Sequence, residues 1–137
     1  MIRMRELPSI YVIADSAAIA AFDHNEIGAD PNSGDQRLRL IQSLRTIDYS
    51  QSFVVVVMRS ITCGSCSMQV ERVARQGDHV RVGAIYTNPL PMQGSTTMVA
   101  EPFEVIVVTK EGAWGQNIGF DLFVGGRVVA NTSAFVP

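Results

Sequence analysis

The sequence contains little that would carry catalysis or bind a charged polymer. Its 137 residues include two cysteines, two histidines and one tryptophan, and Lys110 is the single lysine. Eleven basic residues stand against 13 acidic ones, so the chain has a formal charge of −2 and lacks the basic surplus with which proteins bind nucleic acid or anionic membranes. We therefore expect neither nucleic acid nor a membrane surface as a partner.

Long hydrophobic runs are missing as well. The longest unbroken apolar run is Phe53 to Met58, far shorter than the roughly 18 residues that cross a bilayer, which predicts no membrane insertion. The apolar stretch near the N-terminus is broken by Pro8 and Asp15, and this excludes a signal-peptide core. This pattern predicts a cytoplasmic protein if Met1 is the natural start, and a protein outside the cytoplasm if an export signal has been removed. Two cysteines are too few to decide the compartment.

The common motifs of hydrolases, kinases and calcium-binding loops are absent. There is no Gly-x-Ser-x-Gly elbow and no phosphate-binding loop. Asp30 and Asp35 flank a turn-rich segment that lacks the closing glutamate of an EF-hand. Because no acid, base and nucleophile come together in the sequence, it favours a non-enzymatic protein without cofactor or metal.

A hydrophobic content of 47% and a mean hydropathy of +0.17 predict that the chain folds. Its length fits one domain, so we expect residues 1–137 to form a single domain. Residues 1–46 form a strand plus helical part in this prediction, and residues 47–137 form a β-rich part.

The first part combines a strand signal with two helix signals. Ile10 to Ala14 is a short β-branched and aromatic run, and Ser16 offers a hydroxyl to cap a helix over residues 17–22. Turn formers gather at residues 28–35, where we expect a surface loop. A second short helix is predicted by apolar residues at helical spacing, namely Leu38, Ile41 and Leu44.

The second part is dominated by strand signals. Residues 53–58 are a β-branched run that predicts a central strand buried on both faces. Residues 68–70 and 80–86 alternate between apolar and polar side chains on either side of a turn at residues 75–78, which is a β-hairpin pattern. An irregular, proline-containing connection is expected after it, at residues 88–94.

Two more strand segments follow. Residues 103–109 form a β run, and Gly125-Gly126 joins residues 120–124 to 127–130 in a predicted hairpin. Most connections are too short for parallel crossovers. The fold class is therefore predicted as α+β, mostly β: one or two N-terminal helices followed by an antiparallel sheet or sandwich of five to six strands.

Cys63-Gly64-Ser65-Cys66 is the one local motif with chemical potential, since two thiols at this spacing form a disulfide, bind zinc or exchange disulfides. A thioredoxin-like oxidoreductase would use Cys63 as the attacking thiolate and Cys66 as the resolving thiol, with Pro102 facing them. Such a site requires a helix after the pair, because the helix dipole lowers the thiol pKa. The alternation that follows Cys66 favours a strand instead, so the redox enzyme is the alternative hypothesis and a thiol pair without catalytic role is favoured.

Zinc binding is a further alternative for the same pair. A closed site needs four ligands, and only His24 and His79 are available to complete Cys63 and Cys66. Nothing in the spacing recommends that set. Trp114 lies among glycines between two strand segments, where it either covers the core or anchors a partner, and the first interpretation is favoured.

Residues 47–112 resemble a known family. An aspartate-aromatic lead-in, IDYSQSFVVVVM, is followed by the hairpin SMQVERVARQGDHVRV and by EPFEVIVVTKEG with its proline-aromatic start. This order resembles the C-terminal domain of the bacterial protease complex subunit family of type B. The family's Gly-Gly-aromatic turn is replaced here by residues 63–66, and its commonly exported members carry a signal that this sequence does not show.

The resemblance implies a non-enzymatic β-rich module that assists or associates with a partner protein, and it brings no active-site residues. The residues themselves favour the same function, a protein-binding or assembly module. A small-molecule-binding sandwich remains a third hypothesis, because pocket shape depends on how the sheets pack.

Overall fold

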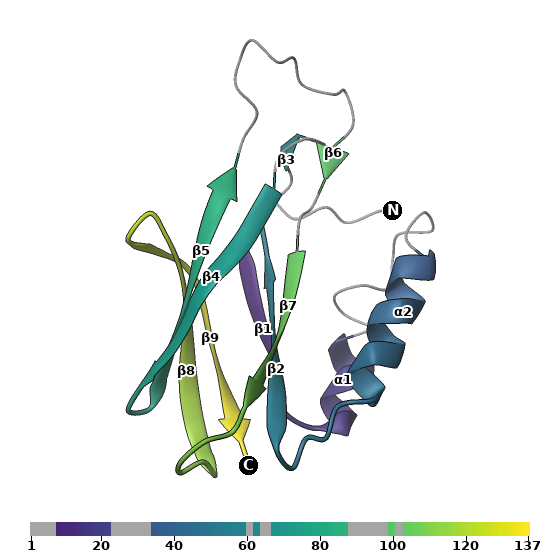
Figure 1. The fold of residues 1–137 in the computed structure, drawn as a ribbon, viewed down its shortest axis with the longest axis vertical. Coiled ribbons are helices and arrows are strands. Elements are labelled where there is room, and N and C mark those ends of the chain that lie inside the picture. Colours follow the sequence, from purple (N-terminus) through teal and green to yellow (C-terminus); the bar gives the residue numbers. More distant parts are fainter. Residues whose placement is uncertain (1–7, 23–33, 60–61, 64–66, 88–98, 101–102) are drawn as a thin grey trace.

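The computed structural model describes residues 8–22, 34–59, 62–63, 67–87, 99–100 and 103–137, and only the backbone of residues 34–38, 62–63 and 99–100. These residues form three layers, with two helices on one side, a three-stranded sheet in the middle and a four-stranded sheet on the other side (Figure 1). The protein is thus mostly β with two helices in its N-terminal region, as the sequence predicts.

The described helices and strands follow one another as β1 (Ser9–Ile13), α1 (Ser16–Phe22), α2 (Gly34–Arg45), β2 (Ser52–Met58), β3 (Thr62–Cys63), β4 (Ser67–Gln76), β5 (His79–Thr87), β6 (Val99–Ala100), β7 (Phe103–Thr109), β8 (Gln116–Val124) and β9 (Arg127–Val136). The helix-side sheet has the order β1-β2-β7, and the outer sheet has the order β4-β5-β8-β9. The short strands β3 and β6 pair with each other.

Strand β2 lies at the centre of the helix-side sheet and is buried on both faces, as predicted. Successive side chains of a strand point to opposite faces, so a continuous apolar run supplies two cores at once. Phe53, Val55 and Val57 pack in the core between the two sheets. Val54, Val56 and Met58 pack in the core beneath the helices. The valine run is therefore what joins the three layers.

Both helices cover the helix-side sheet, and their boundaries differ from the prediction. Helix α2 buries Ile41 and Leu44 against this sheet, while the side chain of Leu38 lies outside the described residues. The predicted loop at residues 28–35 is too long at its end, because α2 already begins at Gly34; residues 28–33 lie outside the described residues.

Asp15, not Ser16, caps helix α1. The Ala18 N–H donates a hydrogen bond of 2.8 Å to Asp15 Oδ1, which satisfies one of the free N–H groups of the first turn. Ser16 is instead the first residue of the helix. The prediction of a Ser16 cap is wrong because both side chains are good caps, and the residue just after β1 occupies the non-helical position.

We expect Asp15→Ala to lower the free energy of unfolding by about 1 kcal/mol, the usual cost of losing an N-cap. Asp15→Ser keeps an oxygen acceptor at the same position and should keep most of that stability. Urea unfolding followed by circular dichroism measures both variants. Equal stability of Asp15→Ala and the wild type would show that the hydrogen bond to Ala18 contributes nothing.

The outer sheet contains both predicted hairpins. Strands β4 and β5 pair antiparallel around Gly77, and β8 and β9 pair antiparallel around Gly125 and Gly126. These three glycines have φ angles of 63°, 60° and 77°, which side chains other than glycine rarely adopt. The second hairpin is longer than predicted, since β8 begins at Gln116 and β9 extends to Val136.

One pair of neighbouring strands departs from the antiparallel prediction. Strands β5 and β8 pair in parallel, with Val80 opposite Phe120. The chain passes through β7 of the other sheet between these two strands, so it re-enters the outer sheet in the same direction. The sheets are therefore mostly, and not wholly, antiparallel. Among the described residues, no helix has the length and hydropathy of a membrane span.

Candidate protein-binding edge

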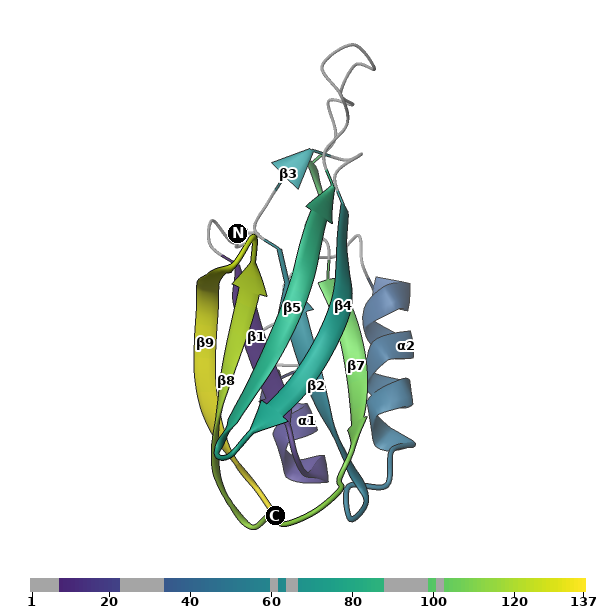
Figure 2. The ribbon, with the colours of Figure 1, turned by 60° about the vertical axis from the view of Figure 1, so that its left-hand side comes forward.

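The two sheets have neighbouring edges on one side of the sandwich. Strand β7 is the edge of the helix-side sheet and β4 is the edge of the outer sheet, and they lie next to each other (Figure 2). A shallow groove of about 380 Å³ separates them, lined by residues 70–73 of β4 and 104–107 of β7. On the opposite side, β1 packs against β9. The β4–β7 side is therefore where the sandwich is hollowed along two strand edges.

Glu104 closes part of this groove. Its side chain is half-buried, and its Oε2 accepts a hydrogen bond from the Val70 N–H. Strand β4 also has a bulge between Val70 and Arg72, which interrupts its regular pairing with β5. Bulges and inward-pointing charges are two ways in which proteins block an edge strand. The edge of β4 is thus interrupted and occupied near its middle.

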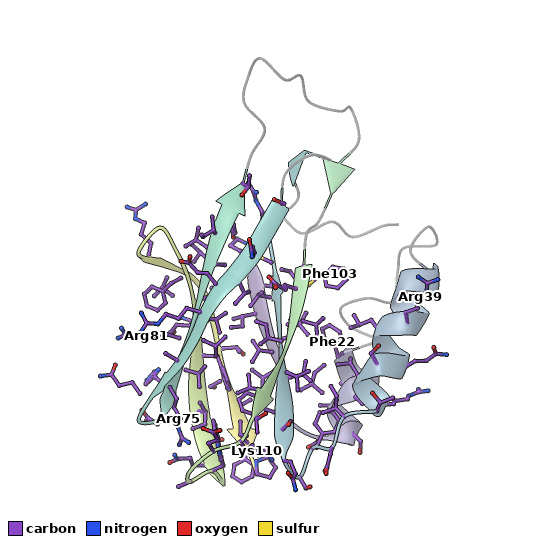
Figure 3. The ribbon with its side chains drawn as sticks, in the orientation of Figure 1. Phe22, Arg39, Arg75, Arg81, Phe103 and Lys110 are labelled. Atoms are coloured by element: carbon purple, nitrogen blue, oxygen red, sulfur yellow. The ribbon has the colours of Figure 1, made fainter. Side chains whose placement is uncertain are left out.

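The edge of β7 carries an apolar stripe. Phe103 and Val107 are 43% and 54% exposed, and Val105 between them packs against the core beneath the helices. These three residues share the helix-facing side of the sheet, because they pair with Met58, Val54 and Val56 of β2, whose side chains face the helices. Figure 3 shows Phe103 on the side of β7 that faces away from the outer sheet. The helices leave both ends of this stripe exposed.

The backbone of β7 is also available for pairing. Among the described residues β7 pairs with β2 alone, in a regular antiparallel register from Ser52–Thr109 to Met58–Phe103. In such a pair, the N–H and C=O groups of every second residue point away from the partner strand. An apolar strand with an unpaired row of backbone groups is the surface that accepts an added strand.

Arg59 fixes the end of the sandwich next to this edge. It is 7% exposed, and its Nη1 donates hydrogen bonds to the carbonyl oxygens of Ser67 at 2.8 Å and Thr87 at 3.3 Å. Its guanidinium lies 4.3 Å from the ring centre of Tyr86. Burial raises the pKa of the Tyr86 hydroxyl, and the Arg59 charge opposes that rise. Arg59 therefore connects the end of β2 to β4 and β5, a role that its place after an apolar run did not reveal.

The cysteine pair lies at the same end of the molecule as Arg59. Cys63 is in β3, opposite Val99 of β6, while Cys66 and Pro102 lie outside the described residues. From Ser67 onward the chain forms strand β4, so the helix that a thioredoxin-like site requires does not follow the pair. The physical argument for a lowered thiol pKa at Cys63 is therefore missing.

The four candidate zinc ligands are not brought together by the described residues. His79 begins β5 in the outer sheet, with its Nδ1 at 3.6 Å from Asp121 Oδ2, and His24 lies outside the described residues. The described part of the chain holds no group of three or more side chains suited to a metal ion. His79 instead lies over Gly119, where an added Cβ would come within 2.8 Å of the imidazole.

Trp114 covers the core, as expected. Its ring packs against Phe53 at 5.2 Å between ring centres, and the guanidinium of Arg75 lies 3.9 Å from the Trp114 ring centre. Lys110 lies at the far end of β7, where its Nζ donates a hydrogen bond to the Tyr49 carbonyl at 2.7 Å. The aromatic side chains of Phe53 and Phe120 pack between the sheets at 0% exposure, so the interior favours a packed core over a small-molecule cavity.

The chain matches no protein-family model, and searches of curated proteins and of solved structures find no match either. The class of protein is therefore defined by architecture: a three-layer sandwich of helices and two β-sheets, with an apolar strand edge open among the described residues.

Proposed function

We propose that the protein is a non-enzymatic binding or assembly module that adds an extended segment of a partner protein to the edge of β7. The observation that carries this proposal is the combination, on one strand, of an unpaired edge with the exposed side chains of Phe103 and Val107. Backbone hydrogen bonds supply affinity in this mode of recognition, and alternate side chains supply specificity.

The neighbouring groove supports the same proposal. An added strand next to β7 has side chains on both faces of the sheet. On one face they would meet Phe103 and Val107, and on the other they would enter the groove between β7 and β4. Glu104 limits strand addition to β4 by occupying the Val70 N–H, so β7 is the better of the two edges. The preferred partner segment is therefore extended and apolar at alternate positions.

The resemblance of residues 47–112 to the C-terminal domain of the bacterial protease complex subunit family of type B adds a partner class to this proposal. Under that resemblance, the partner is a component of a protease complex. The binding chemistry proposed for β7 does not depend on this identification, since it rests on the strand edge.

We expect Val107→Lys to weaken binding of a strand-forming peptide about tenfold or more, because a lysine on an edge strand opposes strand addition. Val107 is 54% exposed, so the fold should tolerate the change. Peptides are selected from a random display library on the wild-type protein, and their affinities are then measured for both proteins. Gln42→Lys, at an exposed position of α2, adds the same charge far from β7 and serves as the control.

Selected peptides with alternating apolar residues that lose affinity only for Val107→Lys would support the proposal. Peptides that bind Val107→Lys and Gln42→Lys as tightly as the wild type would contradict it.

A further inference from the structure

The outer face of the β4-β5-β8-β9 sheet carries a second feature, which the proposed edge does not use. Across this face the register places Arg72 opposite Gly83, Gly83 beside Phe123, and Phe123 opposite Val128. Val82 and Ala84, the neighbours of Gly83, are buried in the core, so this row belongs to the outward face.

Two arginines flank the position of Gly83. Arg72 lies on the same face, since its Cβ is 3.8 Å from the place where a Cβ on Gly83 would be. Arg81 precedes Gly83 by two residues, and its guanidinium lies 5.4 Å from the ring centre of Phe123. Both arginines are exposed, and Figure 3 shows Arg81 on the side of the molecule opposite the helices. Gly83 leaves the space between Arg72 and Phe123 without a side chain.

Apolar side chains border these arginines. Ile85 is 47% exposed and follows Gly83 along β5, and Val128 is 49% exposed and lies opposite Phe123. We call the five residues Arg72, Arg81, Ile85, Phe123 and Val128 the arginine-aromatic patch. Arginine and aromatic residues at the centre of an apolar area are the composition of binding hot spots.

The charge of the patch indicates what it would bind. The chain as a whole has a formal charge of −2, yet within the described residues neither Arg72 nor Arg81 has a carboxylate partner within ion-pair distance. Asp121, the acidic residue next to Arg81 across the sheet, lies near His79 instead, at 3.6 Å from its Nδ1. Two exposed guanidinium groups beside apolar side chains favour a partner that offers carboxylates and apolar side chains together.

We propose that the arginine-aromatic patch is a docking surface for an acidic protein segment in which carboxylate and apolar side chains alternate. The patch lies on the face of the outer sheet, whereas the proposed strand addition uses the edge of the other sheet. The protein would thereby hold two partner segments at once, and each surface stands or falls separately.

The test uses a fluorescent peptide in which Asp or Glu alternates with Phe or Leu. Fluorescence anisotropy should show that it binds the wild type, and that Arg81→Glu and Arg72→Glu each weaken binding about tenfold or more. Arg39→Glu, an exposed position on α2 at the other side of the molecule, makes the same charge change and should leave binding unaltered (Figure 3). Val107→Lys should also leave it unaltered, which separates this patch from the β7 edge.

Three results would overturn the proposal: no binding of the acidic peptide to the wild type, equal binding of a peptide with Lys in place of Asp and Glu, or equal loss in Arg39→Glu. Anionic vesicles of phosphatidylserine serve as a further probe. Vesicle binding that depends on Arg72 and Arg81, without binding of the peptide, would assign the patch to a lipid surface and contradict the proposed protein partner.

Discussion

Replacing Phe53 by alanine should lower the free energy of unfolding by about 3–5 kcal/mol, the range typical of a fully buried phenylalanine. Phe53 is 0% exposed and lies between Trp114 and Phe120, with ring centres at 5.2 Å and 5.8 Å. Truncation leaves a cavity among aromatic rings that the surrounding sheets close only in part. Urea unfolding followed by far-ultraviolet circular dichroism measures the loss without relying on the fluorescence of Trp114.

Phe135→Ala is the matched control for Phe53→Ala, because it removes the same atoms from a side chain that is 56% exposed. We expect this control to change the free energy of unfolding by less than about 1 kcal/mol. Similar losses at Phe53 and Phe135 would contradict a core that lies between the two sheets.

Removal of the Arg59 side chain should lower the free energy of unfolding by about 2–4 kcal/mol, because Arg59→Ala leaves two carbonyl groups without their charged donor. The carbonyls belong to Ser67 and Thr87, at the start of β4 and the end of β5. Arg59→Lys keeps the charge but loses the planar fork that reaches two acceptors, so it should lie between alanine and the wild type.

Arg127→Ala is the control for this prediction, since Arg127 is an exposed arginine next to the β8–β9 turn. It should change the free energy of unfolding by about 0.5 kcal/mol or less. If Arg59→Ala were as mild as Arg127→Ala, the two hydrogen bonds would not hold this end of the sandwich together.

Local patterns in the sequence were enough to predict most of the strands. The run Phe53 to Met58 predicts a strand buried on both faces because no polar residue interrupts it, and β2 has that environment. The alternation around Gly77 predicts the β4–β5 hairpin, because a short turn leaves only one way to pair the two strands.

Features that depend on distant parts of the chain could not be predicted in the same way. The parallel pairing of β5 and β8 follows from the path of the chain through β7, and no residue pattern in either strand specifies that neighbour. The exposure of Phe103 and Val107 likewise depends on the position of β7 at the edge of its sheet. One signal was available, since Glu104 is a charge within an otherwise apolar strand, as is common at sheet edges.

The candidate site was therefore missed by the sequence, which drew attention to Cys63 and Cys66. Thiol pairs are visible as a local motif, whereas an open strand edge is a property of sheet order. The structure places Cys63 in β3 and follows the pair with strand β4, so the neighbourhood that makes a cysteine reactive is not formed by the described residues.

Hydrogen exchange of the backbone amides of β7, measured by NMR with and without a peptide selected for binding, tests the proposed function most directly. Strand addition predicts slower exchange at alternate residues of Phe103 to Thr109, because only every second N–H points away from β2. Exchange in β7 that is unchanged by a bound peptide, with protection confined to other strands, would contradict the account.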